Sequence, residues 1–171
     1  RRPHLTDLNS AINYNEIFEQ LQLLRLAIYA PSAFILPSQL YKYKEEESTT
    51  GHRLSIEERE QGIQRLMNIQ LLKRLESSVN SFRLTLSRIR DYMQETLDAI
   101  AQFQNGERRI SVDDYESADV DEDEQEFTIG KKKNRILLED MDYISWQQEI
   151  KGDLEIIRLL LTMLESITPE H

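Results

Sequence analysis

The feature that most constrains this chain is a series of apolar residues in which spacings of three and four alternate. Its members are Leu72, Leu75, Val79, Phe82, Leu86, Ile89 and Met93, and the same face continues to Ile100 and Phe103. This spacing puts them on one face of a helix, and its average of about 3.5 residues is the repeat of a coiled-coil seam. Such a helix needs partners, because burying each of these side chains contributes about 1.5–3 kcal/mol.

The helix that carries this series is predicted to span residues 55–104. Ser55 and Glu58 form a capping-box pattern at its start, and Asn105-Gly106 is a typical stop at its end. No proline lies between these signals. We therefore expect one continuous helix that is about 70 Å long.

Two further helices are predicted, one on each side of the long helix. Residues 14–29 repeat apolar side chains at helical spacing until Pro31, and residues 140–167 do so until Pro169. We expect an all-α fold in which the last helix returns antiparallel to the long helix and forms a hairpin with it, although the connecting segment is long enough to allow a parallel return as well. The first helix packs at the base of this hairpin. The fold then has two helices at the tip and three at the base, with both chain ends near the base.

Residues 107–133 have a different composition from the helices. Between Asp113 and Glu126 there are nine carboxylates and no basic residue. A segment of this kind buries too little apolar surface to offset the entropy lost on ordering. We therefore predict an acidic, mobile linker between the two long helices.

Composition limits the class of protein. We interpret the 171 residues as a single helical domain that is a fragment of a larger protein, because the chain begins with Arg1 and stops directly after the last helix. The net charge of −10 gives no overall basic surface for nucleic acid. The absence of cysteine suits a cytoplasmic protein and excludes disulfides and cysteine-based zinc sites. The apolar run over residues 156–164 is far shorter than the roughly 18 residues of a membrane span.

The sequence contains no motif that would carry chemistry. It has neither a phosphate-binding loop nor a dinucleotide fingerprint. The acidic run over residues 119–130 lacks the glycine and the final glutamate of a calcium loop. We therefore expect no catalytic residue, cofactor site or metal site within this chain.

A local excess of basic residues is the one candidate for a binding site. Between Leu71 and Arg90 the only acidic residue is Glu76, which gives this stretch a charge of +4 in a chain of −10. These side chains either pair with acidic residues of neighbouring helices, or they contact DNA or an acidic face of an adjoining domain. The five basic residues are Lys73, Arg74, Arg83, Arg88 and Arg90.

Part of the chain resembles a known family. The run Leu-Leu-Lys-Arg-Leu-Glu-Ser-Ser at residues 71–78, followed by Ser-Phe and Leu-Thr-Leu up to residue 86, is similar to a segment of bacterial Snf2-type (superfamily 2) helicase-like ATPases. In that family this segment falls between the two ATPase lobes. Weaker similarity extends over residues 24–32, 138–146 and 167–171.

The resemblance implies that the parent protein uses ATP and Mg²⁺ to move on DNA or to remodel a protein–DNA complex. This chain would then link and orient the ATPase lobes, whose nucleotide-binding residues lie outside residues 1–171. Lys73, Arg74 and Arg83 would contact DNA or a lobe. The alternative is a coiled-coil-like adaptor that binds a protein partner, or a second copy of itself, through its apolar seam.

Overall fold

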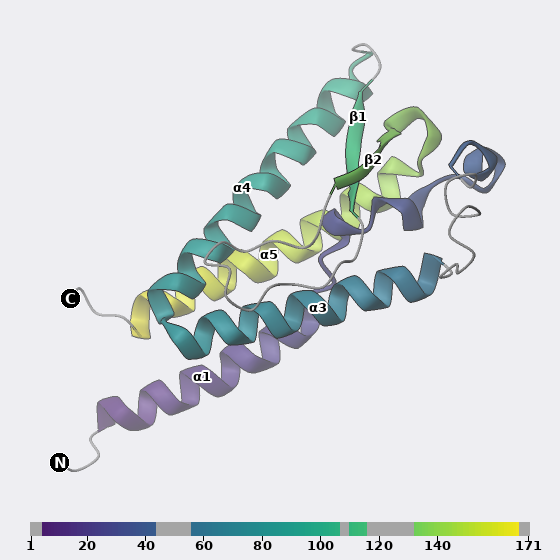
Figure 1. Cartoon of the computed structure of the whole chain (residues 1–171). Helices are drawn as coiled ribbons and strands as arrows, with labels where there is room; N and C mark the ends of the chain where they lie inside the picture. Colours follow the sequence, from purple (N-terminus) through teal and green to yellow (C-terminus); the bar gives the residue numbers. More distant parts are fainter. Residues whose placement is uncertain (1–4, 44–55, 107–109, 116–131, 168–171) are drawn as a thin grey trace.

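The computed structural model describes residues 5–43, 56–106, 110–115 and 132–167, and most of these residues are helical. The all-α prediction is therefore confirmed (Figure 1). The long helices are α1 (Leu5–Leu23), α3 (Ile56–Ser77), α4 (Val79–Gln104) and α5 (Tyr143–Ile167). None of the described helices is long and apolar enough to cross a membrane.

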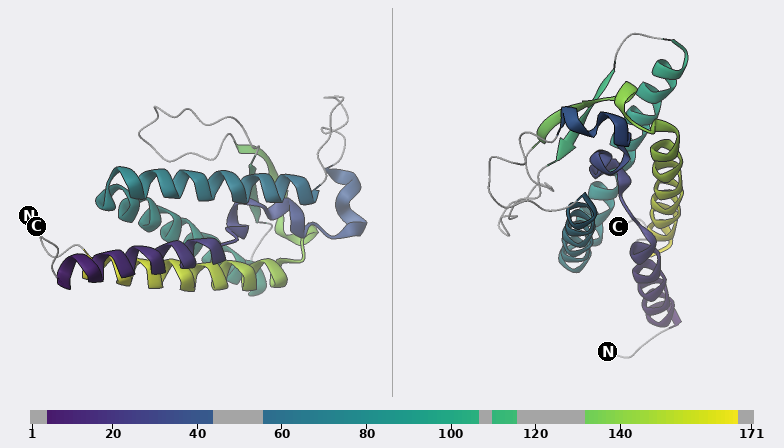
Figure 2. Two further views of the ribbon diagram at one scale, coloured as in Figure 1. Left: turned by 90° about the horizontal axis from the view of Figure 1, so that it is seen from below. Right: turned by 90° about the vertical axis from the view of Figure 1, so that its right-hand side faces the viewer.

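Helix α5 lies between α1 and α4 and runs antiparallel to both (Figures 1 and 2). The rings of Phe103 and Tyr143 meet edge to face, with centroids 5.2 Å apart, where α4 ends and α5 begins. Further along, Arg158 of α5 donates to Gln94 of α4. This pairing confirms the predicted antiparallel hairpin for α4 and α5. The observed start of α5 at Tyr143 is three residues later than predicted.

The predicted helix over residues 55–104 is divided into two by Ser78. Ser78 has an extended backbone, with φ −170° and ψ 130°, and its side-chain oxygen accepts from the amide of Ser81 as an N-cap. Helices α3 and α4 therefore form a V rather than a 70 Å rod (Figure 1). The sequence signal was misleading because the apolar series continues through the break without a proline or glycine.

The first helix also differs from the prediction of residues 14–29, since α1 begins at Leu5 and ends at Leu23. Leu26 then adopts the left-handed conformation, with φ 54°. The segment after Leu26 does not continue α1 but turns into the space between α3 and α4. It contains three short 3-10 helices. They are η1 (Ala27–Tyr29), η2 (Pro31–Phe34) and η3 (Pro37–Lys42).

A β-hairpin occupies part of the predicted acidic linker. Strand β1 (Ser111–Tyr115) pairs antiparallel with β2 (Lys132–Leu137), and Val112 lies opposite Ile136. Both of these apolar side chains are buried and belong to the same core as the helices, so this part of the linker packs against the helical body. The linker prediction was therefore wrong for the strands, and residues 116–131 lie outside the described residues.

Packing at the base of the hairpin is arranged differently from the prediction. Helix α1 packs along α5, whereas the apolar face of α3 is covered by the segment that contains η2. An isolated bridge joins Ile35 of this segment to Met141, the residue that follows the turn η4 (Leu138–Asp140) and precedes the start of α5. One continuous core therefore includes residues from all of these elements, among them Ile17, Ile28, Met67, Phe82, Ile136 and Trp146.

Candidate functional site

The five predicted basic residues lie on both sides of the break at Ser78. Lys73 and Arg74 belong to α3, with Lys73 exposed and Arg74 partly buried. Arg83 and Arg90 are partly buried on α4, and Arg88 is exposed. The break therefore distributes the basic stretch over two helices that point in different directions.

On α4 the basic residues occupy two opposite flanks. Arg83 and Arg90 are seven residues apart, so helical spacing places them on the flank that also carries Gln94 and faces α5. Arg83 donates to Asn80, and the Nε of Arg90 lies 3.2 Å from a carboxylate oxygen of Asp91. Both contacts are made to neighbours on the same helix. The charge of Arg90 is therefore paired with Asp91 within α4, whereas the contact of Arg83 with Asn80 leaves its charge uncompensated by that partner.

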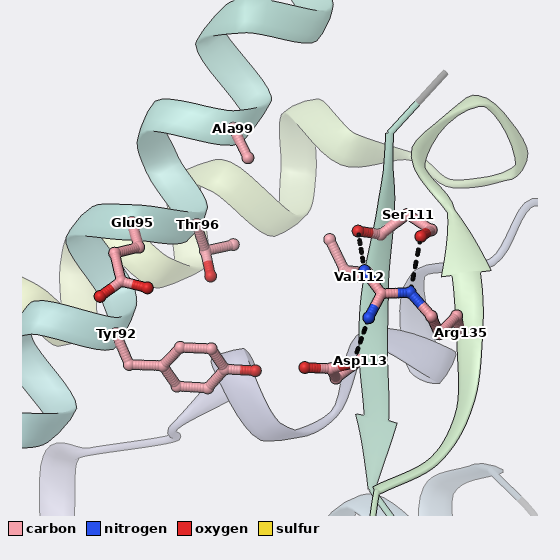
Figure 3. Close-up of a pocket in the computed structure, with 8 residues that line it drawn as sticks. All are labelled: Tyr92, Glu95, Thr96, Ala99, Ser111, Val112, Asp113 and Arg135. Atoms are coloured by element: carbon pink, nitrogen blue, oxygen red, sulfur yellow. Dashed lines mark hydrogen bonds and ion pairs between the residues drawn. The ribbon is translucent and has the colours of Figure 1, made fainter. Parts of the chain in front are cut away.

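Arg88 lies on the other flank of α4, one turn before Tyr92. This flank forms one wall of a pocket of about 160 Å³ between α4 and β1 (Figure 3). The α4 wall consists of Tyr92, Glu95, Thr96 and Ala99, and the opposite wall consists of Ser111, Val112, Asp113 and Arg135. In Figure 3 the hydroxyl of Tyr92 points across the pocket toward the carboxylate of Asp113.

Arg135 closes the strand side of this pocket. Its guanidinium donates to the Ser111 hydroxyl at 2.8 Å, to the Asp113 carboxylate at 3.0 Å and to the Ser111 carbonyl at 3.2 Å. The arginine of β2 thus links the two strands of the hairpin through Ser111 and Asp113 of β1. The sequence prediction did not include this residue, because the hairpin that brings Arg135 to Ser111 was not predicted.

A buried carboxylate, Asp140, ties the segment after α1 to the turn before α5. Asp140 is 2% exposed, and it accepts from the Lys42 ammonium at 3.1 Å and from the Tyr43 hydroxyl at 2.6 Å. The Tyr43 hydroxyl in turn accepts from the Leu137 amide at 3.2 Å. Burial, together with the hydrogen bond to Asp140, raises the pKa of Tyr43 above its ordinary value. This cluster therefore acts as a structural clamp.

Replacing Tyr43 with phenylalanine is expected to lower the free energy of unfolding by about 1–3 kcal/mol, because Asp140 and the Leu137 amide each lose a partner. Tyr41 is 68% exposed, so Tyr41→Phe serves as the matched control and is expected to change stability by less than about 0.5 kcal/mol. Urea denaturation of both variants measures the difference. Equal stabilities would show that the clamp contributes nothing.

A second buried carboxylate, Asp153 of α5, fixes the turn after α1. Its two oxygens accept from the backbone amides of Arg25 at 2.9 Å and Ala27 at 3.0 Å. Two turns earlier on the same face of α5, the Trp146 indole donates to the Ala27 carbonyl at 2.7 Å. Burial is the main cause that raises the pKa of Asp153, and the two backbone amides oppose it. These contacts explain why Leu26 can hold its left-handed conformation.

Among the described residues, no group of three or more histidine or acidic side chains is placed to hold a metal ion. No family model matches the sequence, and no curated protein or solved structure gives a significant match.

Proposed function

We propose that this chain is a helical connector of a Snf2-type, ATP-dependent DNA helicase or translocase. In this role it joins and orients the two ATPase lobes and contributes no catalytic residue of its own. ATP and Mg²⁺ are bound by the lobes, outside residues 1–171. The proposal combines the similarity at residues 71–86 with one structural observation.

That observation is the position of the two outer helix ends. Arg25 near the end of α1 contacts Asp153 of α5, and the two helices run antiparallel from there. The first turn of α1 and the last turn of α5 therefore lie at the same end of the molecule, beside the junction of α3 and α4 (Figures 1 and 2). A helical unit with neighbouring ends can be inserted between two lobes without disturbing the fold of either.

The basic residues near this end supply the contact surface in the proposal. Lys73 and Arg74 lie within two turns of Ser78 on α3, and Arg83 lies in the second turn of α4. All three are thus close to the end of the molecule where the lobes would be attached. We assign Lys73, Arg74 and Arg83 to contacts with the DNA backbone, with Arg88 and Arg90 further along α4.

Duplex DNA is expected to bind residues 1–171 at low salt and to dissociate as salt is raised, because the contacts are electrostatic. Arg74→Glu combined with Arg83→Glu should weaken binding about tenfold or more, and should reduce the salt dependence by about two phosphate contacts. Fluorescence anisotropy with a labelled duplex measures both effects. Arg65→Glu combined with Lys151→Glu is the matched control, since both residues are exposed and lie outside the basic stretch.

Equal losses in the two double variants would contradict a specific DNA surface at Arg74 and Arg83. An absence of binding at low salt, with helicity and thermal stability unchanged, would also contradict the DNA contact. The basic residues would then have to face a lobe.

The adaptor is the alternative from a different class, and the packing gives it less support. The seam residues Phe82, Leu86, Ile89 and Met93 are each at most 2% exposed, since they pack within the chain. A partner or a second copy could use this seam only by displacing the chain's own helices. A coding sequence with a phosphate-binding loop upstream and an arginine-finger motif downstream would eliminate the adaptor.

A further inference from the structure

The break at Ser78 is the place where the local sequence and the fold disagree most. Residues 63–104 contain no glycine or proline, and most of them favour helix. The structure nevertheless takes Ser78 out of the helical conformation. Positions at which local preference and tertiary structure conflict are often functional, because the fold must hold them against an alternative.

Only one residue departs from helical geometry at this break. The Ser78 amide still donates to the Arg74 carbonyl at 2.9 Å, and its carbonyl still accepts from the Phe82 amide at 3.0 Å, as in an uninterrupted helix. The break removes the three helical bonds that the amides of Val79, Asn80 and Ser81 would donate, and the Ser78 hydroxyl replaces one of them by accepting from the Ser81 amide at 3.1 Å. The extended conformation of Ser78 is unstrained. Rotation about this single residue therefore converts the V into a straight helix.

The buried faces of α3 and α4 would form one stripe in that straight helix. The last buried apolar residue of α3 and the first of α4 are Leu75 and Phe82, which are seven residues apart, or two turns. Within α3 and within α4, successive buried apolar residues of this face are three or four positions apart. The buried residues in order are Ile63, Met67, Leu71, Leu75, Phe82, Leu86, Ile89 and Met93.

We propose that Ser78 is a hinge between two states of the chain, a V and a continuous helix. In the V the apolar face of α3 packs onto the core, and the Ser78 cap stabilises the start of α4. In the straight state α3 continues the axis of α4 and leaves the core. The alternating apolar series over residues 72–103 is compatible with both the V and the continuous helix. This is expected of an element with two stable conformations.

The straight state would carry α3 toward the end of the molecule where α1 begins and α5 ends. Arg158 lies against Gln94, so the last residues of α5 lie opposite the first turns of α4, and an aligned α3 extends beyond them. The partner that would cover its exposed apolar face there is an adjoining ATPase lobe. This identification of the partner rests on the proposed function, whereas the hinge itself does not.

The hinge can be tested by measuring the distance between the two arms. The chain has no cysteine, so cysteines introduced at the exposed positions Gln61 and Ala101 receive spin labels selectively. A straight helix separates these positions by about 60 Å, at 1.5 Å per residue. The V gives a much shorter distance, because α3 and α4 both run from the same vertex toward the same side of the molecule (Figures 1 and 2).

Two substitutions favour the straight state in combination. Leu71→Gln weakens the packing of α3, since Leu71 is fully buried, and Ser78→Ala removes the cap and introduces the strongest helix former. The double variant is expected to show a resolved population near 60 Å with its helicity retained. Leu71→Gln with Ser77→Ala is the matched control, because Ser77 is exposed within α3 and does not cap α4, and it should lack this population.

Three results would overturn the hinge. The first is a double variant that keeps only the short distance. The second is a long-distance population of equal size in the Ser77→Ala control. The third is a loss of helicity in place of the long distance, which would show that α3 unfolds when released and does not align with α4. The measurement uses neither DNA nor nucleotide, so its outcome is independent of the DNA-binding test.

Discussion

Replacing Trp146 with alanine should destabilise the protein by about 3–5 kcal/mol, the largest effect expected of a single substitution here. Trp146 is 1% exposed at the centre of the core, and its removal leaves a large cavity between α5 and η1. The substitution also removes the indole donor from the Ala27 carbonyl, which is buried. Both losses act on the segment that turns away from α1.

Chemical denaturation followed by far-ultraviolet circular dichroism measures this effect, because Trp146 is the only tryptophan and cannot serve as a fluorescent probe in its own absence. Trp146→Phe keeps most of the apolar volume and should retain part of the stability. Ile144→Ala is the surface control on the same helix, since Ile144 is 52% exposed. If Trp146→Ala were as mild as Ile144→Ala, the packing described for α5 and η1 would be contradicted.

Asp153→Ala is expected to have the second largest effect, a loss of about 2–5 kcal/mol. The backbone amides of Arg25 and Ala27 would both lose their acceptor, which costs about 1–3 kcal/mol at the buried Ala27 amide and less at the part-buried Arg25 amide. Glu149→Ala is the matched control, because Glu149 forms only a partly exposed ion pair with Arg25 at 3.5 Å. Its removal should cost less than about 1 kcal/mol. Equal effects would show that the amide contacts of Asp153 do not stabilise the turn.

The same residue predicts a pH dependence. Burial raises the pKa of Asp153 in the folded protein, so the folded state binds this proton more tightly than the unfolded state does. The stability from this group is therefore complete below about pH 4 and is lost as the pH rises through the raised pKa. The free energy of unfolding of the wild type should thus fall relative to that of Asp153→Asn as the pH rises above about 4. The opposite slope would contradict the raised pKa.

The sequence predicted the helical faces well, because periodic burial is a local property. The members of the alternating series on α4, from Phe82 to Ile100, are buried, and so are Trp146, Ile150 and Ile157 of the predicted stripe on α5. The antiparallel return of α5 followed from these stripes. Their positions required only the period of the helix.

The errors arose where contacts distant in sequence override local preference. Helix α1 stops at Leu23 because Asp153, more than a hundred residues later, accepts the amides that follow. The strands form because Val112 and Ile136 share a core position across the linker. Ser78 breaks a strong helical pattern for the same kind of reason, since η2 offers α3 a surface to pack against.

The candidate site was predicted as residue types but not as a surface. On a single straight helix the five basic residues would follow one rod, whereas the V separates Lys73 and Arg74 from the residues of α4. The pocket between α4 and β1 depends on Arg135 reaching Ser111 across the hairpin. Neither arrangement can be derived from spacing along the chain.

The connector proposal places this chain between two ATPase lobes, so its most direct test is ATP hydrolysis by the full-length protein that the proposal implies, with and without duplex DNA. We predict hydrolysis that increases when DNA is added, and an increase that becomes smaller when Arg74→Glu and Arg83→Glu are introduced into the full-length protein. Absence of ATP hydrolysis by the full-length protein, with or without DNA, would contradict the proposal.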